Sequence, residues 1–592
     1  MHQTAGGGLP GSGAMRLART MAQLRPAQAA QRLRLRAQRT ALNRGLPIAG
    51  GWLLSGPDPR KAACWPAGYQ PLDALVGGTG CDIGALRAGK LRLLGMARAV
   101  ATAPAAGSGT ADWPTADWEQ AGAPLLWRFH LYYWDWAWAL ARSPDGGQAR
   151  AALAAIWESW HAAVPAGRGP AWHPYPAALR AWSWCGLYEP LVAGGPVEEP
   201  FLRELAVHAG FLRRNLETDV GGNHLIKNLK ALAGLALFFS DEALLTRSLR
   251  LLRRELRVQV LPDGGHYERA PAYHCQVLGD LLDIGRLLRA AGRAELAEPA
   301  GLAEAIAAMR GWLGVVATPA GDPPMLNDGF PVSRELLAGL APAPRPGGPL
   351  HLLPDTGIAS ATAGSWHLLA DVGLPCPREL PAHAHADTLS CLVHVDGEPL
   401  LVDTGTSTYA AGAARDRERS TAAHNTLEVD GRDSTEVWGA FRAGRRARPR
   451  LVAARAAGDT VTVQAAHDGY RGLAGRPVHH RRWTLTPGGL RVDDTVTGGG
   501  QHRVVVRWHL APGAGLRLVD GGAEVTTPAG RLTVRVTSSA AARPRLTARQ
   551  AQVSAGFSRT VMAPVLACEL EPELPVQVST VWRQTQPRQE AL

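Results

Sequence analysis

The sequence predicts an α+β multidomain protein in which a helical region of stacked hairpins or a toroid precedes an antiparallel β-sandwich. Three observations predict this fold. The chain of 592 residues is too long for one ordinary domain. Apolar residues recur at helical spacing up to about residue 340, and alternating strands with tight turns follow. We therefore expect a basic arm at 1–45, a helical domain at 46–340 and a β-sandwich domain at 341–592.

The helical region carries apolar residues three and four positions apart. Turn clusters rich in glycine, such as 143–147 and 219–222, separate the segments. The predicted helices are Ala151–Ala163, Leu202–Leu216, Leu225–Phe239, Glu242–Val258 and Gln276–Ala291.

A Pro/Gly-rich break at 341–348 marks the change from helices to strands. The segment Cys391–Val395 alternates, Asp396-Gly397 makes a hairpin turn, and Pro399–Val402 returns. The same device follows Thr426–Val429. The other predicted strands are Thr460–Gln464, Arg503–Trp508, Ala523–Thr527 and Leu532–Thr537.

Basic residues are in excess, giving a formal charge of +12. Residues 1–45 hold eight arginines and no Asp or Glu, and a second basic run lies at 442–450. An arginine excess suits a polyanion, whether nucleic acid, anionic lipid or acidic polysaccharide, and it is equally compatible with a solvated surface. No nucleic-acid recognition motif accompanies it, so we do not expect a nucleic-acid partner.

Other bulk features exclude several classes. The seven cysteines form no C-x-x-C pair, which argues against a disulfide framework or a cysteine zinc site. The sequence has no apolar stretch long enough for a transmembrane segment and no legible signal peptide. Leu17–Arg39 is a candidate amphipathic surface helix. Most of the 19 tryptophans precede residue 200, where we expect core positions more often than sugar-stacking platforms. The compartment and the oligomeric state stay open.

Two polar segments stand out in the helical region. In Gly221-Gly-Asn-His-Leu-Ile-Lys-Asn228, Asn223 is a predicted N-cap and His224 the first helical residue, a position suited to an anionic group or to a plain helix cap. In the second segment, 263–274, two tyrosines, two histidines, a Glu and an Arg precede a helix. Burying so many polar groups for structure alone is costly, which favours a functional site.

A third polar segment runs from His383 to Asn425. His383 and His385 lie two apart at the predicted start of a strand, and therefore on one face. With Asp403 and His424 they offer a donor set for zinc, although H-x-H pairs also occur in strands that bind no metal.

These segments together resemble the heparinase II/III family, which includes relatives of alginate lyases. The resemblance covers roughly residues 120–450 and rests on motifs in a fixed order: WHPYPAALRAWSW, GGNHLIKNLKAL, DGGHYERAPAYH, HAHADTLSCLVHVDGEPLLVDTGT and RSTAAHNTLEVDG. It implies an incomplete (α/α) toroid followed by an antiparallel β-sandwich.

The resemblance also implies roles for single residues. Asn223 and His224 match the pair that neutralises the substrate carboxylate, Tyr273 the residue that transfers the proton, and His383 the catalytic histidine. Ala270 stands where the family usually has serine, and Tyr267 is the competing tyrosine. The expected zinc ligands, for one structural site, are His385, Asp403 and His424. The expected substrate contacts are Tyr267, Glu268, Arg269, His274 and Arg419.

The expected activity is a lyase that cleaves an acidic, uronate-containing polysaccharide by β-elimination. An ordinary phenol is a poor base at neutral pH, so Tyr273 requires a neighbouring cation such as His274, Arg269 or His383. Three alternatives remain: a zinc hydrolase, a glycoside hydrolase using unpaired Asp263, Glu268 or Asp328, and a non-catalytic protein of polysaccharide binding or assembly. The polymer, its C5 epimer and endo or exo action stay open.

Overall fold

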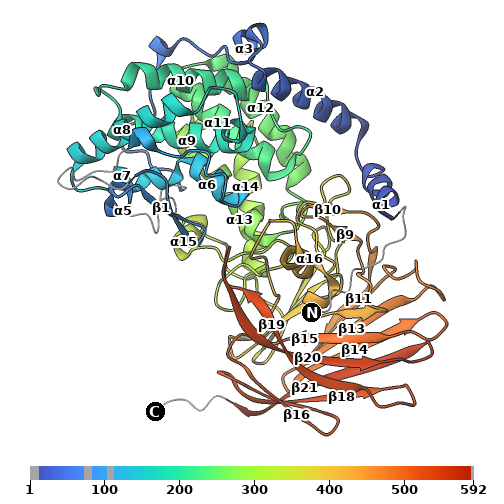
Figure 1. Cartoon of the computed structure of the whole chain (residues 1–592). Coiled ribbons are helices and arrows are strands. Elements are labelled where there is room, and N and C mark those ends of the chain that lie inside the picture. The colour runs from blue at the N-terminus through green and yellow to red at the C-terminus, as the bar shows by residue number, and fades with distance from the viewer. Residues whose placement is uncertain (1–11, 73–82, 103–112, 588–592) are drawn as a thin grey trace, which may run out of the picture.

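The computed structural model describes residues 12–72, 83–102 and 113–587. A helical region and a β region lie end to end, and the chain passes from one to the other between α15 (Arg334–Leu340) and β3 (Leu350–Leu353). Figure 1 shows the helices in blue and green above the strands in orange and red.

The described part of the basic arm, residues 12–45, holds helices α1 (Ser12–Met21) and α2 (Pro26–Asn43), and α3 (Pro47–Leu53) follows it. The three helices lie along the outer edge of the molecule (Figure 1). The predicted single helix over Leu17–Arg39 is therefore wrong. Pro26 occupies the first turn of α2, where its missing N–H and fixed φ start a new helix instead of continuing the old one.

The helical domain is a toroid of antiparallel helices. Helix α11 packs against α9, α12 and α13, and nearly all of its side chains are buried. The predicted helices correspond to α8 and α10 to α13. The main helices are α6 (Leu125–Tyr133), α7 (Trp138–Ala141), α8 (Gly146–Ala163), α9 (Pro174–Leu191), α10 (Glu198–Leu212), α11 (Gly222–Phe238), α12 (Glu242–Gln259), α13 (Pro271–Ala290) and α14 (Leu302–Val316). Shorter elements are η1 (Pro59–Lys61), α5 (Ile83–Arg87), β1 (Lys90–Leu93), β2 (Met96–Ala99), η2 (Trp113–Thr115), η3 (Asp135–Ala137), η4 (Pro170–Trp172) and η5 (Ala294–Leu296).

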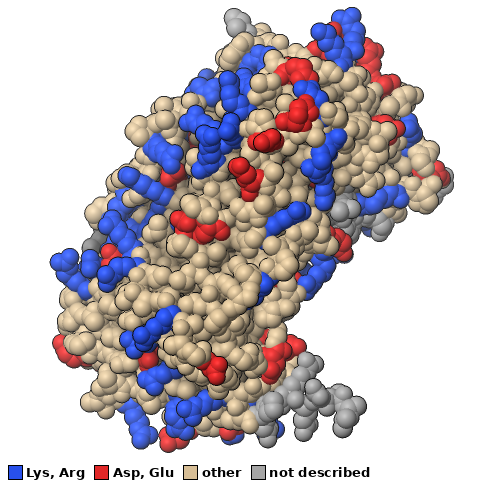
Figure 2. All heavy atoms as spheres, turned by 180° about the vertical axis from the view of Figure 1, so that it is seen from behind, with Lys and Arg blue, Asp and Glu red and all other residues tan. Residues whose placement is uncertain are grey.

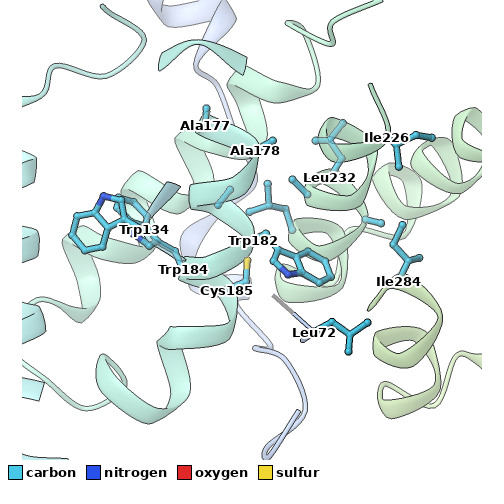
Figure 3. Packing of buried hydrophobic residues seen from close by; sticks show 14 of the residues in the cluster. Leu72, Trp134, Ala177, Ala178, Trp182, Trp184, Cys185, Ile226, Leu232 and Ile284 are labelled. Atoms are coloured by element: carbon cyan, nitrogen blue, oxygen red, sulfur yellow. The ribbon is translucent and has the colours of Figure 1, made fainter. Parts of the chain in front are cut away.

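Tryptophans fill the core of this toroid. Trp134, Trp182 and Trp184 are buried among small, aliphatic and further aromatic side chains (Figure 3). The ring of Trp182 lies 4.5 Å from that of Trp65, and a Cβ on Gly234 would come within 2.8 Å of both rings. The core interpretation of these tryptophans is confirmed. Removing one such side chain typically costs 3–5 kcal/mol.

The β region is an antiparallel sandwich whose sheets enclose one apolar core with Trp483, Trp508 and Trp582. The sheet orders are β3-β4-β5-β6-β7, β19-β20-β15-β8 and β11-β12-β13-β14-β21-β18-β17-β16, with a separate β9–β10 pair. The further bounds are β4 (Ile358–Ala363), β5 (Trp366–Asp371), β6 (Cys391–Val395), β7 (Glu398–Leu401), α16 (Ala413–Arg419), η6 (Thr421–Ala423), β8 (Leu427–Val429), β9 (Val437–Trp438), β10 (Arg442–Ala443), β11 (Pro449–Ala457), β12 (Thr460–His467), β13 (Val478–Thr486), β14 (Gly489–Thr497), β15 (Val504–His509), β16 (Gly515–Val519), β17 (Gly522–Thr527), β18 (Gly530–Ser538), β19 (Arg545–Ser554), β20 (Thr560–Leu570) and β21 (Val576–Pro587).

The cysteines that the structure describes, all but Cys81, are free thiols. Within the described ranges, no helix is long and apolar enough to cross a membrane.

Candidate active site

The first part of the site is the start of α11. Gly221 and Gly222 both have positive φ, and a Cβ on Gly222 would lie 2.2 Å from Oε1 of Glu268. The N-cap is therefore Gly221, and the predicted capping role of Asn223 is wrong because this residue already lies inside the helix. Its backbone N–H instead donates to Oε1 of Glu268 over 2.6 Å, and its Nδ2 donates to both carboxylate oxygens over 3.2 Å.

His224 lies one residue further along and pairs with a carboxylate. Its Nδ1 is 3.0 Å from Oε1 of the fully buried Glu217, whose other oxygen accepts from Nδ2 of Asn228. Burial alone would raise the pKa of Glu217, but His224 and further donors lower it to about 2. The ring of Tyr175 covers the imidazole at 4.2 Å. The contact with Glu217 fixes the orientation of the His224 ring through Nδ1 and leaves Nε2 as its other polar atom.

His383 joins the two domains. It lies in the loop between β5 and β6, so the prediction that the H-x-H pair starts a strand is wrong. Its Nε2 lies 2.8 Å from Oε2 of Glu268, and its Nδ1 lies 2.9 Å from Oδ2 of Asp328. Burial favours the neutral ring, but the two carboxylates raise the pKa of His383 to about 9. His383 is therefore a buried cation at neutral pH.

Asp328 binds several polar side chains that the β domain contributes to the site. Its carboxylate accepts from Nη1 and Nη2 of Arg415 at 2.5 and 2.8 Å, and from Nε2 of His385 at 2.9 Å. Oγ1 of Thr406 also donates to it. Burial would raise the pKa of Asp328, but Arg415 and the two histidines hold it well below its ordinary value. The carboxylate is thus a fixed anion that orients His383 and Arg415.

Tyr273, near the start of α13, lies against His383 with ring centroids 3.9 Å apart. Its hydroxyl is 2.6 Å from that of Tyr409, and the guanidinium of Arg415 lies over the Tyr409 ring. Burial raises the pKa of Tyr273 well above its ordinary value, and Tyr409 and Asp328 raise it further. In this arrangement Tyr273 is a neutral phenol.

The other predicted substrate contacts fall into two groups. Glu268 lies at the centre of the site, and Tyr267 approaches Gly221 through its hydroxyl. Three side chains are instead bound to backbone carbonyls. Nη1 of Arg269 donates to Thr356, Nε2 of His274 contacts Met309, and the guanidinium of Arg419 donates to Ala384, Gly439 and Arg442.

Tyr273 is expected to need a neighbouring cation, and His274, Arg269 and His383 are the candidates. The pKa of His274 is lowered to about 3 by burial, so it is no cation near neutral pH. Of the three cations expected beside the phenol, His383 is the one whose ring contacts it.

The three expected zinc ligands are all buried. Nδ1 of His424 lies 2.8 Å from Oδ2 of Asp403, and the rings of His385 and His424 are 5.3 Å apart. Nδ1 of His385 and Nε2 of His424 are buried without a partner, as a metal ligand would be. However, the described residues contain no group of three or more His, Cys, Asp or Glu side chains placed to hold a metal. Zinc therefore stays a prediction, and no chemical step is assigned to it.

Sequence reasoning missed four members of the site: Tyr175, Glu217, Tyr409 and Arg415. Tyr175 lies within the WHPYPAALRAWSW motif, so its motif was the available signal. The other three come from loops or short helices whose local sequence has no periodic pattern. Asp328, one of the candidate carboxylates for which the sequence predicts no partner, is linked to Glu268 through His383.

The comparisons with known proteins agree with this architecture. The family description "Heparinase II/III N-terminus" matches residues 112–340, and "Heparinase II/III-like, C-terminal" matches residues 345–566. The two matches span most of the chain and follow its two structural domains. The protein belongs to the heparinase II/III family, a family of polysaccharide lyases.

Solved structures share the fold at low sequence identity. A heparinase III crystal structure matches with a TM-score of 0.73 at 16% identity, covering 92% of this chain and 91% of its own. Heparan sulfate lyase HepC from Pedobacter heparinus gives 0.57 at 17% identity, covering 95% and 89%.

A curated relative, FtsZ-localized protein C of Caulobacter vibrioides, is 29% identical over 307 residues, covering 48% of this chain and 52% of its own. The chain thus spans about half the length of the curated relative that it matches.

Proposed function

We propose that this protein is a polysaccharide lyase that cleaves a uronate-containing polymer by β-elimination and leaves 4,5-unsaturated uronate ends. The observation that carries the proposal is the meeting of Tyr273, from the toroid, with His383, from the β domain. A phenol, a charged imidazole and the amide of Asn223 supply what this elimination needs: a proton donor and groups that stabilise a developing carboxylate charge.

The chemistry starts at C5 of the uronate. A base removes the C5 proton, the electron pair forms the C4–C5 double bond, and the C4–O4 bond breaks as its oxygen accepts a proton. Removing the C5 proton adds charge to the neighbouring carboxylate, so nearby donors lower the barrier. His383, a cation with a pKa of about 9, stands beside Tyr273 for this purpose.

The pKa of Tyr273 and the hydrogen bond of His224 favour different roles for these two groups in proton transfer. Tyr273 keeps its proton, because its pKa is raised well above the ordinary value, and it therefore suits the acid that protonates O4. His224 suits the base, because Glu217 accepts from Nδ1 and leaves Nε2 available. This pairing is similar to the carboxylate–histidine pairs that orient catalytic imidazoles. With His224 as the base and Tyr273 as the acid, the substrate is the C5 epimer whose C5 proton faces His224.

Glu268 imposes a condition on substrate binding. Its carboxylate already accepts from Asn223 and contacts His383, the same donors that a substrate carboxylate would use. The substrate carboxylate can bind here if it shares the donors of Asn223 and His383 and stays far enough from Glu268 to limit the repulsion between the two carboxylates. We therefore propose that Glu268 positions Asn223 and His383 and that the substrate carboxylate binds to the same pair on the side away from Glu268.

The decisive test is ultraviolet absorbance of the unsaturated product during incubation with heparan sulfate, chondroitin, hyaluronan, alginate and a bacterial glucuronan. The parent protein is compared with Tyr273→Phe and with a control, Tyr69→Phe, whose hydroxyl donates to a backbone carbonyl away from the site. Rising absorbance that Tyr273→Phe abolishes and Tyr69→Phe retains supports the lyase. Release of reducing ends without absorbance would instead establish hydrolysis.

A second candidate is a non-catalytic polysaccharide-binding or assembly protein. Two observations favour it: the donors of Asn223 and His383 already hold Glu268, and the curated relative is named for its localisation to FtsZ. This candidate predicts polymer binding without turnover, with equal affinity for the parent protein and Tyr273→Phe.

A further inference from the structure

Helix α1 presents its apolar face to solvent. Ala14, Leu17, Ala18 and Met21 recur at positions i, i+3, i+4 and i+7, which places them on one side of the helix, and all four are exposed. Leu17 and Met21 are 48% and 51% exposed. The usual amphipathic helix of a globular protein turns this side toward the core.

The polar face of α1 is the one that contacts the protein. Arg16 and Arg19 pair with Glu436, and Nε1 of Trp438 donates to Oγ1 of Thr20. These contacts fix the rotation of α1 about its axis. Because the polar side is bound to the protein, the apolar side faces outward. The contacts of the polar side with the β region therefore keep the apolar side of α1 exposed.

Helix α2 faces the protein with its apolar side but also exposes a leucine on its outer side. Gln28, Leu35 and Leu42 point inward and are buried, whereas Leu33, on the outer side, is 70% exposed. Beside Leu33 lies a shallow hollow of about 410 Å³, which Arg36 and Arg44 also line. Leu46 and Trp52 extend the exposed apolar side chains beyond α2. We call this set the arm surface: Leu17, Met21, Leu33, Leu46 and Trp52, with Arg34, Arg36 and Arg44.

The charge on the arm surface has one sign. The first acidic residue of the whole sequence is Asp58. Arg34, Arg36 and Arg44 make no ion pair within the described ranges 12–72, 83–102 and 113–587, whereas Arg25 and Arg32, on the inner side, pair with Glu379 and Asp219. Basic side chains follow the left edge of Figure 2, the side on which α1 and α2 lie. The outward arginines are free to meet an anionic partner.

We propose that the arm surface docks on a lipid bilayer that contains anionic lipid. Leucine, methionine and tryptophan beside unpaired arginines are the composition of helices that lie in the membrane interface, with the apolar side chains among the acyl chains and the cations at the headgroups. These exposed side chains come from three consecutive helices, α1 to α3, that follow the outer edge of the molecule (Figure 1). A second copy of the chain fits less well, because a symmetric contact would bring arginine against arginine.

Vesicle flotation of the full-length protein tests this proposal, comparing phosphatidylcholine vesicles with vesicles holding about one-third phosphatidylglycerol. We expect flotation with the anionic vesicles alone, released by high salt. Leu17→Glu/Leu33→Glu is expected to reduce the bound fraction at least tenfold, and Arg36→Gln/Arg44→Gln is expected to weaken binding to the anionic vesicles. The matched control is Val561→Glu/Met562→Glu, which alters exposed apolar residues of β20 and is expected to float like the parent protein.

Circular dichroism and thermal unfolding confirm that each variant is folded. The proposal is overturned if the parent protein does not float with anionic vesicles, or if Leu17→Glu/Leu33→Glu floats as well as the parent. It is also overturned if light scattering shows a dimer that Leu17→Glu/Leu33→Glu converts to monomers, because the arm surface would then be a contact between copies. The readout is independent of polysaccharide cleavage.

Discussion

The imidazole of His383 stacks on the phenol ring of Tyr273 with centroids 3.9 Å apart and planes 28° from parallel. The two residues come from different domains and are separated by more than one hundred positions in the sequence. This contact therefore depends on the packing of the β domain against the toroid.

Tyr409→Phe removes the hydroxyl bonded to Tyr273 and keeps the ring beneath Arg415. We expect kcat to fall about tenfold with little change in KM, a smaller loss than the 10²–10⁴-fold typical of a lost acid or base at Tyr273. Steady-state kinetics on the polymer identified by the absorbance assay measures both constants. An unchanged kcat would show that the Tyr409 hydroxyl has no part in proton transfer.

Glu268→Gln replaces the carboxylate that holds Asn223 and His383 with a neutral amide. The substitution removes one of the two carboxylates beside the buried His383 cation, and losing one partner of a buried ion pair costs roughly 3–5 kcal/mol. We expect a lower melting temperature and a lower pKa of His383, which NMR titration of the imidazole reports. Glu335→Gln, on the exposed part of α15, is the control and should match the parent protein. Stability and pKa both equal to the parent would refute the positioning role of Glu268.

Glu217 links stability to pH. Its pKa of about 2 lies below the ordinary value of 4.5, so the folded state favours the charged form. The resulting stabilisation, of about 3 kcal/mol, is fully present above pH 4.5 and is lost as the pH falls toward 2. Glu217→Gln should therefore be less stable than the parent at pH 7, with a difference that narrows below pH 4.5. Denaturant unfolding at several pH values measures it, and a constant difference would contradict the assigned pKa.

Gly222 is expected to tolerate no side chain. A Cβ there would meet the Glu268 carboxylate at 2.2 Å, and φ is +58°. Gly301→Ala is the control, because Gly301 has a similar φ of +71° with no atom within 4 Å, so it reports backbone strain alone. We expect Gly222→Ala to lose more stability than Gly301→Ala and to lose activity as well. An equal loss of stability in the two variants would mean that the contact between the new Cβ and Glu268 does not destabilise the protein.

Metal analysis tests the predicted structural zinc. We expect close to one zinc per chain in protein purified without chelators, and loss of that zinc in His385→Ala and His424→Ala. Burying Nδ1 of His385 and Nε2 of His424 without a partner costs free energy that a metal ion would recover. His351→Ala, at a histidine outside this group, is the control. Absence of zinc from the parent protein would sink the prediction.

Local sequence predicted the helices α8 and α10 to α13 and the strand pair β6–β7 because each carries a complete pattern within one segment. The same reasoning misjudged His383 and His385. Spacing by two suggested one face of a strand, whereas the loop directs Nδ1 of His383 and Nε2 of His385 to different oxygens of Asp328. Spacing alone contains no information about a partner more than fifty residues away.

By itself the sequence determined the order of a helical domain and a β domain, the motifs that bring Asn223, Tyr273 and His383 into one site, and the basic character of the arm. Tertiary structure alone decided the charge states and directions of these groups. Burial beside Glu268 and Asp328 makes His383 a cation, burial beside Tyr409 keeps Tyr273 a phenol, and contacts to Glu436 turn the apolar side of α1 outward. A pKa and a side-chain direction depend on neighbours and on exclusion of water, and both are set only when distant segments pack together.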